Sequence, residues 1–325
     1  MAVTFEMRIT FLLLLAVAYG LAEGAPPMAK PNCRDSCGKV SIPYPFGIGS
    51  NCFMNKTYEI VCNESGVAAA AKAFLVLPRI RVEVLEINIS DPYNNYDDSY
   101  YEPGLIRVKM PISSNSINKS SVVGSGGVVD ISGTPFFFSS YRNKFVSVGC
   151  NIKATMAVIG SMVFVGCKTD CNNQKLRGKC QTSVPSDGIQ RLNVTLESTT
   201  NNSTLQDGLQ GFPSDGNPCK HAFLAETRWL ESNETDPFKD VRSLENVPVV
   251  LEWTIPNSTS IMNLNITEAF RRNMDLDYTS YGAKWYYCRY GYEGNPYLNM
   301  RCQGKLLLLT PSIFPNILHY MPNFD

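Results

Sequence analysis

Residues 79–90, with the sequence RIRVEVLEINIS, decide the fold class of this chain. Ile80, Val82 and Val84 alternate with charged residues, and a period of two is typical of a strand with one buried face. The alternation changes phase at Leu85 and then continues, which predicts a β-bulge at that residue. The stretch therefore predicts one long strand with a bulge near its middle.

The residues that follow this strand have the same character. Residues 106–110 alternate in the same way, and other short apolar runs lie between clusters of Gly, Pro, Ser and Asp, as strands do. Such strands are predicted at residues 126–132, 135–139, 144–150, 155–166, 191–197 and 247–255. Residues 219–230 fit either a strand or a helix, because their apolar spacing is ambiguous. The pattern as a whole predicts a mainly β protein.

The first 24 residues have the features of a secretory signal peptide. Arg8 supplies a positive charge, residues 9–18 form a short apolar run, and small residues follow up to Gly24. A membrane-spanning helix needs about 20 apolar residues. The later leucines at 306–309 are followed at once by Pro311, so no membrane span is expected in this chain. The prediction is a secreted, extracellular protein.

Eleven cysteines come after this segment and predict a disulfide-rich fold. Zinc binding is the alternative use of the two Cys-x3-Cys spacings, but the chain has only two histidines and a secretory setting. Because eleven is odd, at least one cysteine lacks a partner within the chain. The cysteines are Cys33, Cys37, Cys52, Cys62, Cys150, Cys167, Cys171, Cys180, Cys219, Cys288 and Cys302.

Asn-x-Ser/Thr sequons are dense and predict heavy N-glycosylation of solvent-facing backbone. The sequons are at Asn55, Asn63, Asn88, Asn118, Asn193, Asn201, Asn202, Asn233, Asn257 and Asn265.

The formal net charge is zero, which removes any global electrostatic reason for binding nucleic acid or an anionic membrane.

Catalytic chemistry has little support. Neither His221 nor His319 lies in a known catalytic motif. A glycosidase needs two carboxylates positioned by the fold, and the acidic pair Asp97–Asp98 lies in a tyrosine-rich polar stretch that we interpret as a solvated loop. No enzyme activity is predicted.

Three pairs of basic residues, each at positions i and i+2, are candidates for ligand binding. In an extended segment such a pair projects two cations from one strand face, and Arg binds a carboxylate through two parallel hydrogen bonds. The alternative is that they are ordinary polar positions opposite a buried face. The pairs are Arg79/Arg81, Arg107/Lys109 and Arg142/Lys144.

An ordered set of motifs extends over residues 30–303. Residues 33–49 read Cys-x3-Cys-Gly and then Ile-Pro-Tyr-Pro-Phe-Gly-Ile-Gly, followed by Cys52 and Cys62. Further motifs lie at residues 135–150, 166–185, 217–223, 247–253 and 288–298. This order resembles the galacturonan-binding ectodomain of the plant wall-associated receptor kinases.

The resemblance implies a mainly β, disulfide-rich, two-domain ectodomain with a vestigial EGF-like end. About 300 residues after the signal peptide suffice for two cores, and the polar composition of residues 198–218 predicts a linker. The expected units are a signal peptide (1–24), a galacturonan-binding β domain (25–197), the family's associated C-terminal domain (198–284), a partial EGF-like segment (285–303) and an unrelated apolar tail (304–325).

The resemblance also implies non-catalytic binding of pectin, meaning homogalacturonan and oligogalacturonides, in the cell wall. No cofactor is expected, although calcium bridging to pectin carboxylates is a possible route. Full-length members continue into a membrane span and a kinase, so we expect a truncated form here. A secreted regulator that binds a protein partner is the alternative, either as a decoy of full-length receptors or as a disulfide-linked dimer.

Two departures from the family pattern concern cysteines. Cys180 runs directly into Gln181, where the family has a further cysteine, and Tyr286 stands at the position of the first EGF-like cysteine. With that cysteine missing and an apolar tail behind it, residues 285–325 are expected to be poorly ordered.

Overall fold

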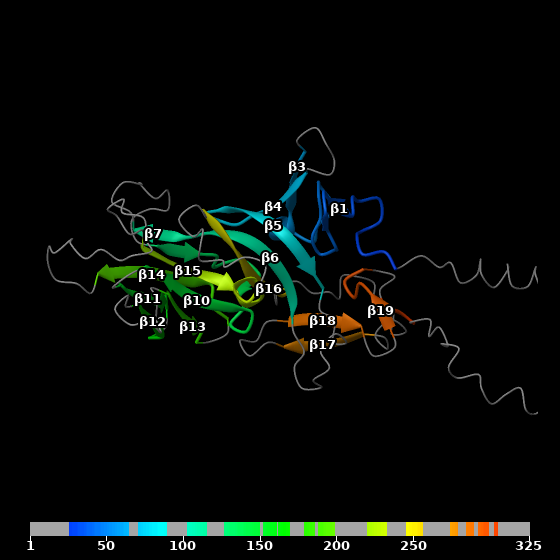
Figure 1. Ribbon diagram of the computed structural model, residues 1–325. Coiled ribbons are helices and arrows are strands. Elements are labelled where there is room, and N and C mark those ends of the chain that lie inside the picture. Colours follow the sequence, from blue (N-terminus) through cyan, green and yellow to red (C-terminus); the bar gives the residue numbers. More distant parts are fainter. Residues whose placement is uncertain are drawn as a thin grey trace, which may run out of the picture.

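The computed structural model describes residues 26–64, 71–89, 103–115, 127–149, 152–160, 162–169, 179–185, 188–198, 220–232, 245–255, 274–278, 284–288, 292–298 and 302–304. It confirms a mainly β, disulfide-rich chain (Figure 1). All pairs between the named strands are antiparallel.

The largest sheet has six strands and forms the centre of the molecule. Its order is β3 (Ile60–Asn63), β4 (Lys72–Val76), β5 (Arg81–Asn88), β6 (Gly104–Pro111), β16 (Asn246–Trp253) and β9 (Phe136–Phe138). The register moves between Val84 and Glu86, so the bulge predicted at Leu85 is confirmed. The bulge lets hydrophobic residues on both sides of Leu85 face the same core.

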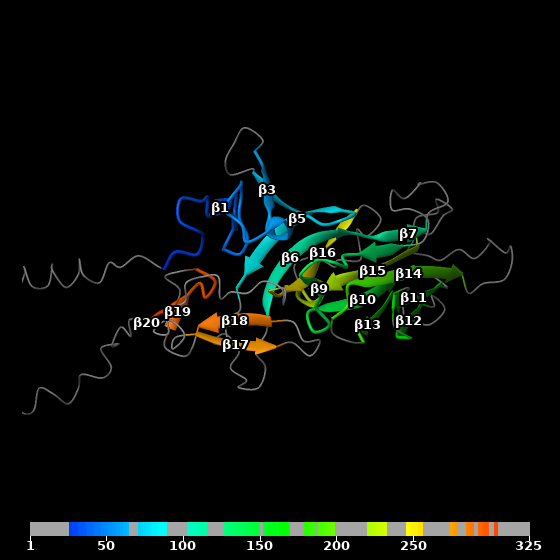
Figure 2. The same cartoon turned by 180° about the vertical axis from the view of Figure 1, so that it is seen from behind.

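Two four-stranded sheets lie together at one end of the molecule (Figure 2). One has the order β13 (Lys179–Ser183), β10 (Asn143–Val148), β15 (Lys220–Glu226) and β7 (Ser113–Asn115). The other has the order β12 (Phe164–Thr169), β11 (Ile152–Val158), β14 (Arg191–Ser198) and β8 (Val128–Asp130).

Three two-stranded sheets and two short helices complete the described part. The strand pairs are β1 (Ser36–Cys37) with β2 (Val40–Ser41), β17 (Met274–Tyr278) with β18 (Lys284–Cys288), and β19 (Tyr292–Gly294) with β20 (Cys302–Gly304). The helices are η1 (Lys56–Tyr58) and α2 (Thr227–Leu230).

Two segments differ from or refine the sequence prediction. Residues 155–166, predicted as one strand, form the end of β11 and the start of β12, joined by a hairpin. Gly160 has φ +98°, a conformation that glycine adopts without strain, and it allows the chain to reverse there. Residues 219–230, left open between strand and helix, form β15 followed by the single turn α2.

Strands on both sides of the predicted linker share sheets. β15 pairs with β10 and β7, and β16 lies between β6 and β9 (Figure 2). Residues from 198–284 therefore complete sheets whose other strands come from residues 25–197. Composition marks the connection at 198–218, but it carries no information on which sheet the chain enters afterwards.

A cluster of aromatic residues lies within the core. The ring of Phe46 lies 5.4 Å from the rings of both Tyr58 and Trp253, and Trp253 lies 5.4 Å from Tyr297. A Cβ atom at Gly104 would come within 2.1 Å of the Trp253 indole. Only glycine at this position lets β6 approach the indole so closely.

The EGF-like end is part of this core, and the expectation of poor order is wrong for its described residues. Tyr297 is fully buried against Trp253, and Cys288 is bonded to Cys302. Asn295 is fully buried too and donates hydrogen bonds to the carbonyls of Met28, at 2.7 Å, and Tyr44, at 2.6 Å. A missing cysteine does not disorder this segment, because burial and these hydrogen bonds hold it in place.

Candidate polysaccharide-binding surface

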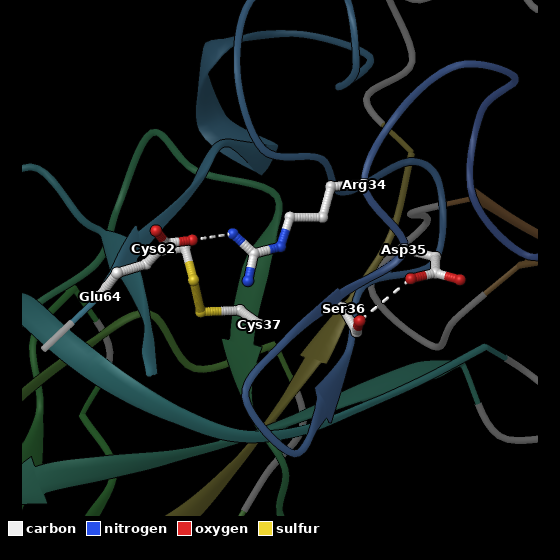
Figure 3. Close-up of a disulfide and its surroundings, with 6 residues drawn as sticks. All are labelled: Arg34, Asp35, Ser36, Cys37, Cys62 and Glu64. Carbon is white, nitrogen blue, oxygen red and sulfur yellow. Dashed lines mark hydrogen bonds and ion pairs between the residues drawn. A yellow bond between two sulfur atoms is a disulfide. The ribbon is translucent and has the colours of Figure 1, made fainter. Parts of the chain in front are cut away.

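Two disulfides fasten the N-terminal segment to the edge of the six-stranded sheet. Cys33 is bonded to Cys52, and Cys37 on β1 is bonded to Cys62 on the edge strand β3. Figure 3 shows Arg34 beside the second disulfide, directed toward Glu64, with which it forms an ion pair. On the other side of Cys37, Ser36 donates a 3.0 Å hydrogen bond to Asp35. The charge of Arg34 is thus already partnered within the chain.

The outer face of β4, β5 and β6 carries the candidate binding surface. Lys72 and Phe74 alternate with buried residues along β4. Phe74 is in register with Glu83 on β5, and Glu83 is in register with Lys109 on β6, so these side chains lie on one face. Arg81, two residues before Glu83, lies on the same face. We call Lys72, Arg81, Glu83 and Lys109 the cationic face.

Glu83 is the one carboxylate within the cationic face. It lies between Lys109, at 3.1 Å, and Lys72, at 3.3 Å. Partial burial by itself raises the pKa of the Glu83 carboxyl, but the hydrogen bonds and charges of Lys109 and Lys72 outweigh that effect, and the pKa lies below its usual value. Glu83 therefore stays ionised and neutralises one of the two lysines.

Arg81 lies against an aromatic ring. Its guanidinium lies 4.2 Å from the centre of the Phe74 ring, a cation–π contact that orients the side chain. No carboxylate of the described residues forms an ion pair with it. A guanidinium held against a ring by a cation–π contact keeps its N–H groups available for a ligand carboxylate.

The six cations predicted from the sequence occupy different elements. Only Arg107 and Lys109 lie within one strand, β6. Arg79 lies in the bend between β4 and β5, because Pro78 begins a turn there, and it does not share a strand with Arg81. Arg142 precedes β10, and its carbonyl accepts a 2.8 Å hydrogen bond from the Thr227 amide. The strand-spaced pairing was therefore wrong for Arg79/Arg81 and for Arg142/Lys144.

Two of these cations form ion pairs within the chain, and the pair made by Arg107 joins two sheets. Arg107 Nε lies 2.6 Å from Glu226 at the end of β15, and Lys144 on β10 lies 3.3 Å from Glu231. The structure thus joins Arg81 and Lys109 in one surface and adds Lys72, which the sequence reasoning missed. The signal for Lys72 was present, since the alternation of β4 begins with it at the exposed phase.

The disulfide prediction is confirmed for eight cysteines. Besides the two N-terminal bonds, Cys167 is bonded to Cys180, and Cys288 to Cys302. Cys150, Cys171 and Cys219 lie outside the described residues. The cysteine expected to lack a partner is therefore one of these three, and the disulfide-linked dimer stays a prediction.

Four of the ten sequons lie within the described residues. Asn63 and Asn88 are exposed, whereas Asn55 and Asn193 are half-buried. Asn63 on β3 is in register with Lys72, so this sequon borders the cationic face. The others lie outside the described part: Asn118, Asn201, Asn202, Asn233, Asn257 and Asn265.

The histidines and the acidic pair considered for catalysis are either buried or outside the described residues. His221 is buried within β15, and His319, Asp97 and Asp98 lie outside the described residues. Within the described ranges, no three His, Cys, Asp or Glu side chains are grouped so that they would hold a metal ion. No helix among these ranges has the length and apolar character needed to cross a bilayer.

Comparison with known proteins decides the family. Residues 33–94 match the family described as wall-associated receptor kinase galacturonan-binding. Wall-associated receptor kinase-like 6 of Arabidopsis thaliana is 29% identical, with 83% of this chain and 44% of the relative aligned. Wall-associated receptor kinase-like 3 of the same plant is 30% identical, with 92% of this chain and 42% of the relative aligned.

The chain belongs to the wall-associated receptor kinase ectodomain family. It matches the receptor part of these kinases, not their catalytic domain, and in this family that part is extracellular and associated with the cell wall. The chain spans 38% of wall-associated receptor kinase-like 5 of Arabidopsis thaliana, at 30% identity, so less than half of that relative is represented. No solved structure matches the chain.

The matched segment coincides with much of the candidate surface. Residues 33–94 contain β1 to β5, with Lys72, Arg81 and Glu83, and the disulfides that fasten β1 to β3. Lys109 lies outside the match and joins the surface only through the pairing of β6 with β5.

Proposed function

We propose that this wall-associated receptor kinase ectodomain binds de-esterified pectin, and that the cationic face contacts the galacturonate carboxylates without catalysing their turnover. The observation that carries the proposal is that Lys72, Arg81 and Lys109 share one face of three adjacent strands, where Glu83 is the carboxylate that pairs with both lysines. Lys72 and Arg81 lie within the segment that matches the galacturonan-binding family.

The chemistry of the ligand fits this surface. Homogalacturonan is a regular row of carboxylates, and the three cations come from the adjacent strands β4, β5 and β6, whose backbones lie about 4.8 Å apart. Arg81 offers paired N–H donors for one carboxylate, and the lysines offer point charges for others. Phe74 lies beside Arg81 and supplies apolar area for the face of a sugar ring.

The test compares ligands first. Purified, folded protein is measured against polygalacturonate and against its methyl-esterified form, at low and high salt, with and without calcium. Binding to the acidic form that weakens with salt supports carboxylate recognition, because exposed charges are screened within about 8–10 Å at physiological salt. Equal binding to both forms contradicts it, and release of new reducing ends contradicts a non-catalytic role.

A matched pair of triple variants then locates the site. The variant Lys72→Ala, Arg81→Ala, Lys109→Ala is expected to weaken binding at least tenfold, equal to about 1.4 kcal/mol. The variant Lys56→Ala, Lys153→Ala, Lys168→Ala removes the same charge from exposed positions elsewhere and serves as the control. If the two variants lose affinity equally, the effect comes from net charge and the cationic face is not the site.

A further inference from the structure

An apolar row crosses the outer face of the sheet β12-β11-β14-β8. Phe164 is in register with Ala157, Ala157 with Asn193, and Asn193 with Val128. Residues in direct register lie on the same face of a sheet. Phe164 is 70% exposed and Val128 is 39% exposed, so nothing among the described residues covers the ends of the row.

On both sides of the apolar row the face carries ion pairs, and beside Phe164 it carries a glycine. Arg191 forms a 3.2 Å ion pair with Asp130 on one side of the row, and Lys153 forms a 3.6 Å pair with Glu197 farther along the strands on the other side. Gly166 lies between, and a Cβ atom there would meet no atom within 4 Å. Open space therefore lies above the sheet beside Phe164.

Asn193 occupies the middle of the apolar row and is the acceptor of a sequon. Val194 and Thr195 follow it, and Thr195 is exposed on the same face. The Asn193 Oδ1 is buried without a hydrogen-bond partner among the described residues, and its amide nitrogen donates no hydrogen bond to any of them. By contrast, the Asn88 amide nitrogen donates a 3.0 Å hydrogen bond to Glu86. The Asn193 nitrogen therefore lies at the centre of this face without a hydrogen bond to the described residues.

We propose that Asn193 carries an N-linked glycan whose first sugars lie over Ala157 and against Phe164, covering the apolar row. Phe164 is two strands away from Asn193, about 10 Å at normal strand spacing. The intervening Ala157 is small enough for a sugar ring to pass over it, and the apolar face of such a ring packs well on an aromatic side chain.

The modification is a group transfer. The amide nitrogen of Asn193 forms a bond to the anomeric carbon of an oligosaccharide carried on a lipid pyrophosphate, and the bond from that carbon to the pyrophosphate oxygen breaks. The amide loses one proton, and the lipid pyrophosphate leaves. The proposal does not depend on pectin binding, because the cationic face belongs to another sheet.

The test uses the full chain secreted from a glycosylating eukaryotic host. Glycopeptide mass spectrometry reports occupancy of Asn193, and binding of a dye for exposed apolar surface reports the state of the face. Asn193→Gln and Thr195→Ala both remove the sequon, and the second keeps the asparagine. Each is expected to raise dye binding roughly threefold and to promote association, whereas Asn63→Gln, which removes a sequon from another sheet, leaves both unchanged.

A second substitution separates glycan cover from misfolding. Phe164→Ser added to Asn193→Gln removes the apolar side chain and is expected to restore low dye binding, or to restore secretion if the single variant is retained. An unmodified Asn193 in secreted protein overturns the proposal, as does unchanged dye binding in both sequon variants or a secretion defect that Phe164→Ser does not relieve. A stable dimer of the glycosylated chain that Phe164→Ser dissociates also overturns it, because a second copy would then cover the face.

Discussion

The side chain of Asn143 pairs with the backbone of Val250 as a neighbouring strand would. Its amide nitrogen donates to the Val250 carbonyl at 2.7 Å, and its Oδ1 accepts from the Val250 amide at 2.9 Å. The same nitrogen donates to the Ser139 carbonyl at 2.7 Å. β9 pairs with β16 only from Leu251 onward, so Asn143 continues the ladder where that strand ends and links two sheets.

Replacing Asn143 therefore has a large predicted cost. Asn143→Ala removes the partner of the buried Val250 N–H, whereas the Val250 carbonyl still accepts from the Ser139 amide at 3.2 Å. The expected loss is roughly 1–3 kcal/mol in the free energy of unfolding. Denaturant unfolding measures it. Gln181→Ala, at an exposed position on the adjacent strand β13, is the control and should change stability by less than about 0.5 kcal/mol. A loss for Asn143→Ala as small as that of the control would contradict the role assigned to this amide.

Asn295 is expected to hold the EGF-like end to the N-terminal segment. Asn295→Ala removes its hydrogen bonds to Met28 and Tyr44 and the one its Oδ1 accepts from Tyr297 at 2.9 Å. We expect faster hydrogen exchange and faster proteolysis around residues 292–298 and 26–46, because both lose the same buried partner. Gln303→Ala, exposed on β20, is the control. Exchange that rises in only one of the two segments would show that Asn295 does not join them.

Glu83→Gln is expected to strengthen galacturonan binding. The change removes the carboxylate that pairs with Lys72 and Lys109 and frees both lysines for the ligand. Affinity should rise roughly three- to tenfold at low salt, equal to about 0.7–1.4 kcal/mol, and the gain should shrink at high salt. Glu197→Gln makes the same charge change on the other sheet and is the control. Weaker binding by Glu83→Gln would indicate that Glu83 positions the lysines for the ligand.

The same carboxyl makes a pH-dependent contribution to stability. Because the folded-state pKa of Glu83 is lowered, its ion pairs stabilise the fold above the unfolded-state pKa of about 4.3, and the contribution is lost as pH falls through the folded-state pKa. The stability difference between the wild type and Glu83→Gln should therefore be largest at neutral pH and should shrink as pH falls below the unfolded-state pKa of about 4.3. A difference that persists unchanged at low pH would exclude ionisation of Glu83 as its cause.

A glycan at Asn63 is expected to limit access to the cationic face. Asn63 is exposed and in register with Lys72 on the neighbouring strand, so a sugar chain there stands beside the lysine. Asn63→Gln, secreted from a glycosylating host, should bind long polygalacturonate more tightly than the wild type. Binding of short oligogalacturonides should change less, because a short ligand avoids the glycan. Equal affinities for the long ligand would rule out this restriction.

Part of the candidate site could be predicted from the sequence. The alternation in residues 79–90 predicted that Arg81 and Glu83 share a face, and the alternation in 106–110 did the same for Arg107 and Lys109, because strand periodicity is a local property. The sequence did not predict that Glu83 lies between Lys72 and Lys109, since register between strands depends on the turns and on the whole buried face. Nor did it predict that Arg107 would form an ion pair with Glu226, which lies 119 residues away along the chain.

The sequence by itself determined the mainly β class, the bulge at Leu85, the disulfide-rich character and the family resemblance, because alternation, cysteine content and short motifs are all read locally. Tertiary structure alone decided that Cys37 pairs with Cys62, that β16 enters the sheet between β6 and β9, and that Tyr297 is buried on Trp253. These relationships join residues far apart in the chain, and only packing of the complete core selects one arrangement from the many that local preferences allow.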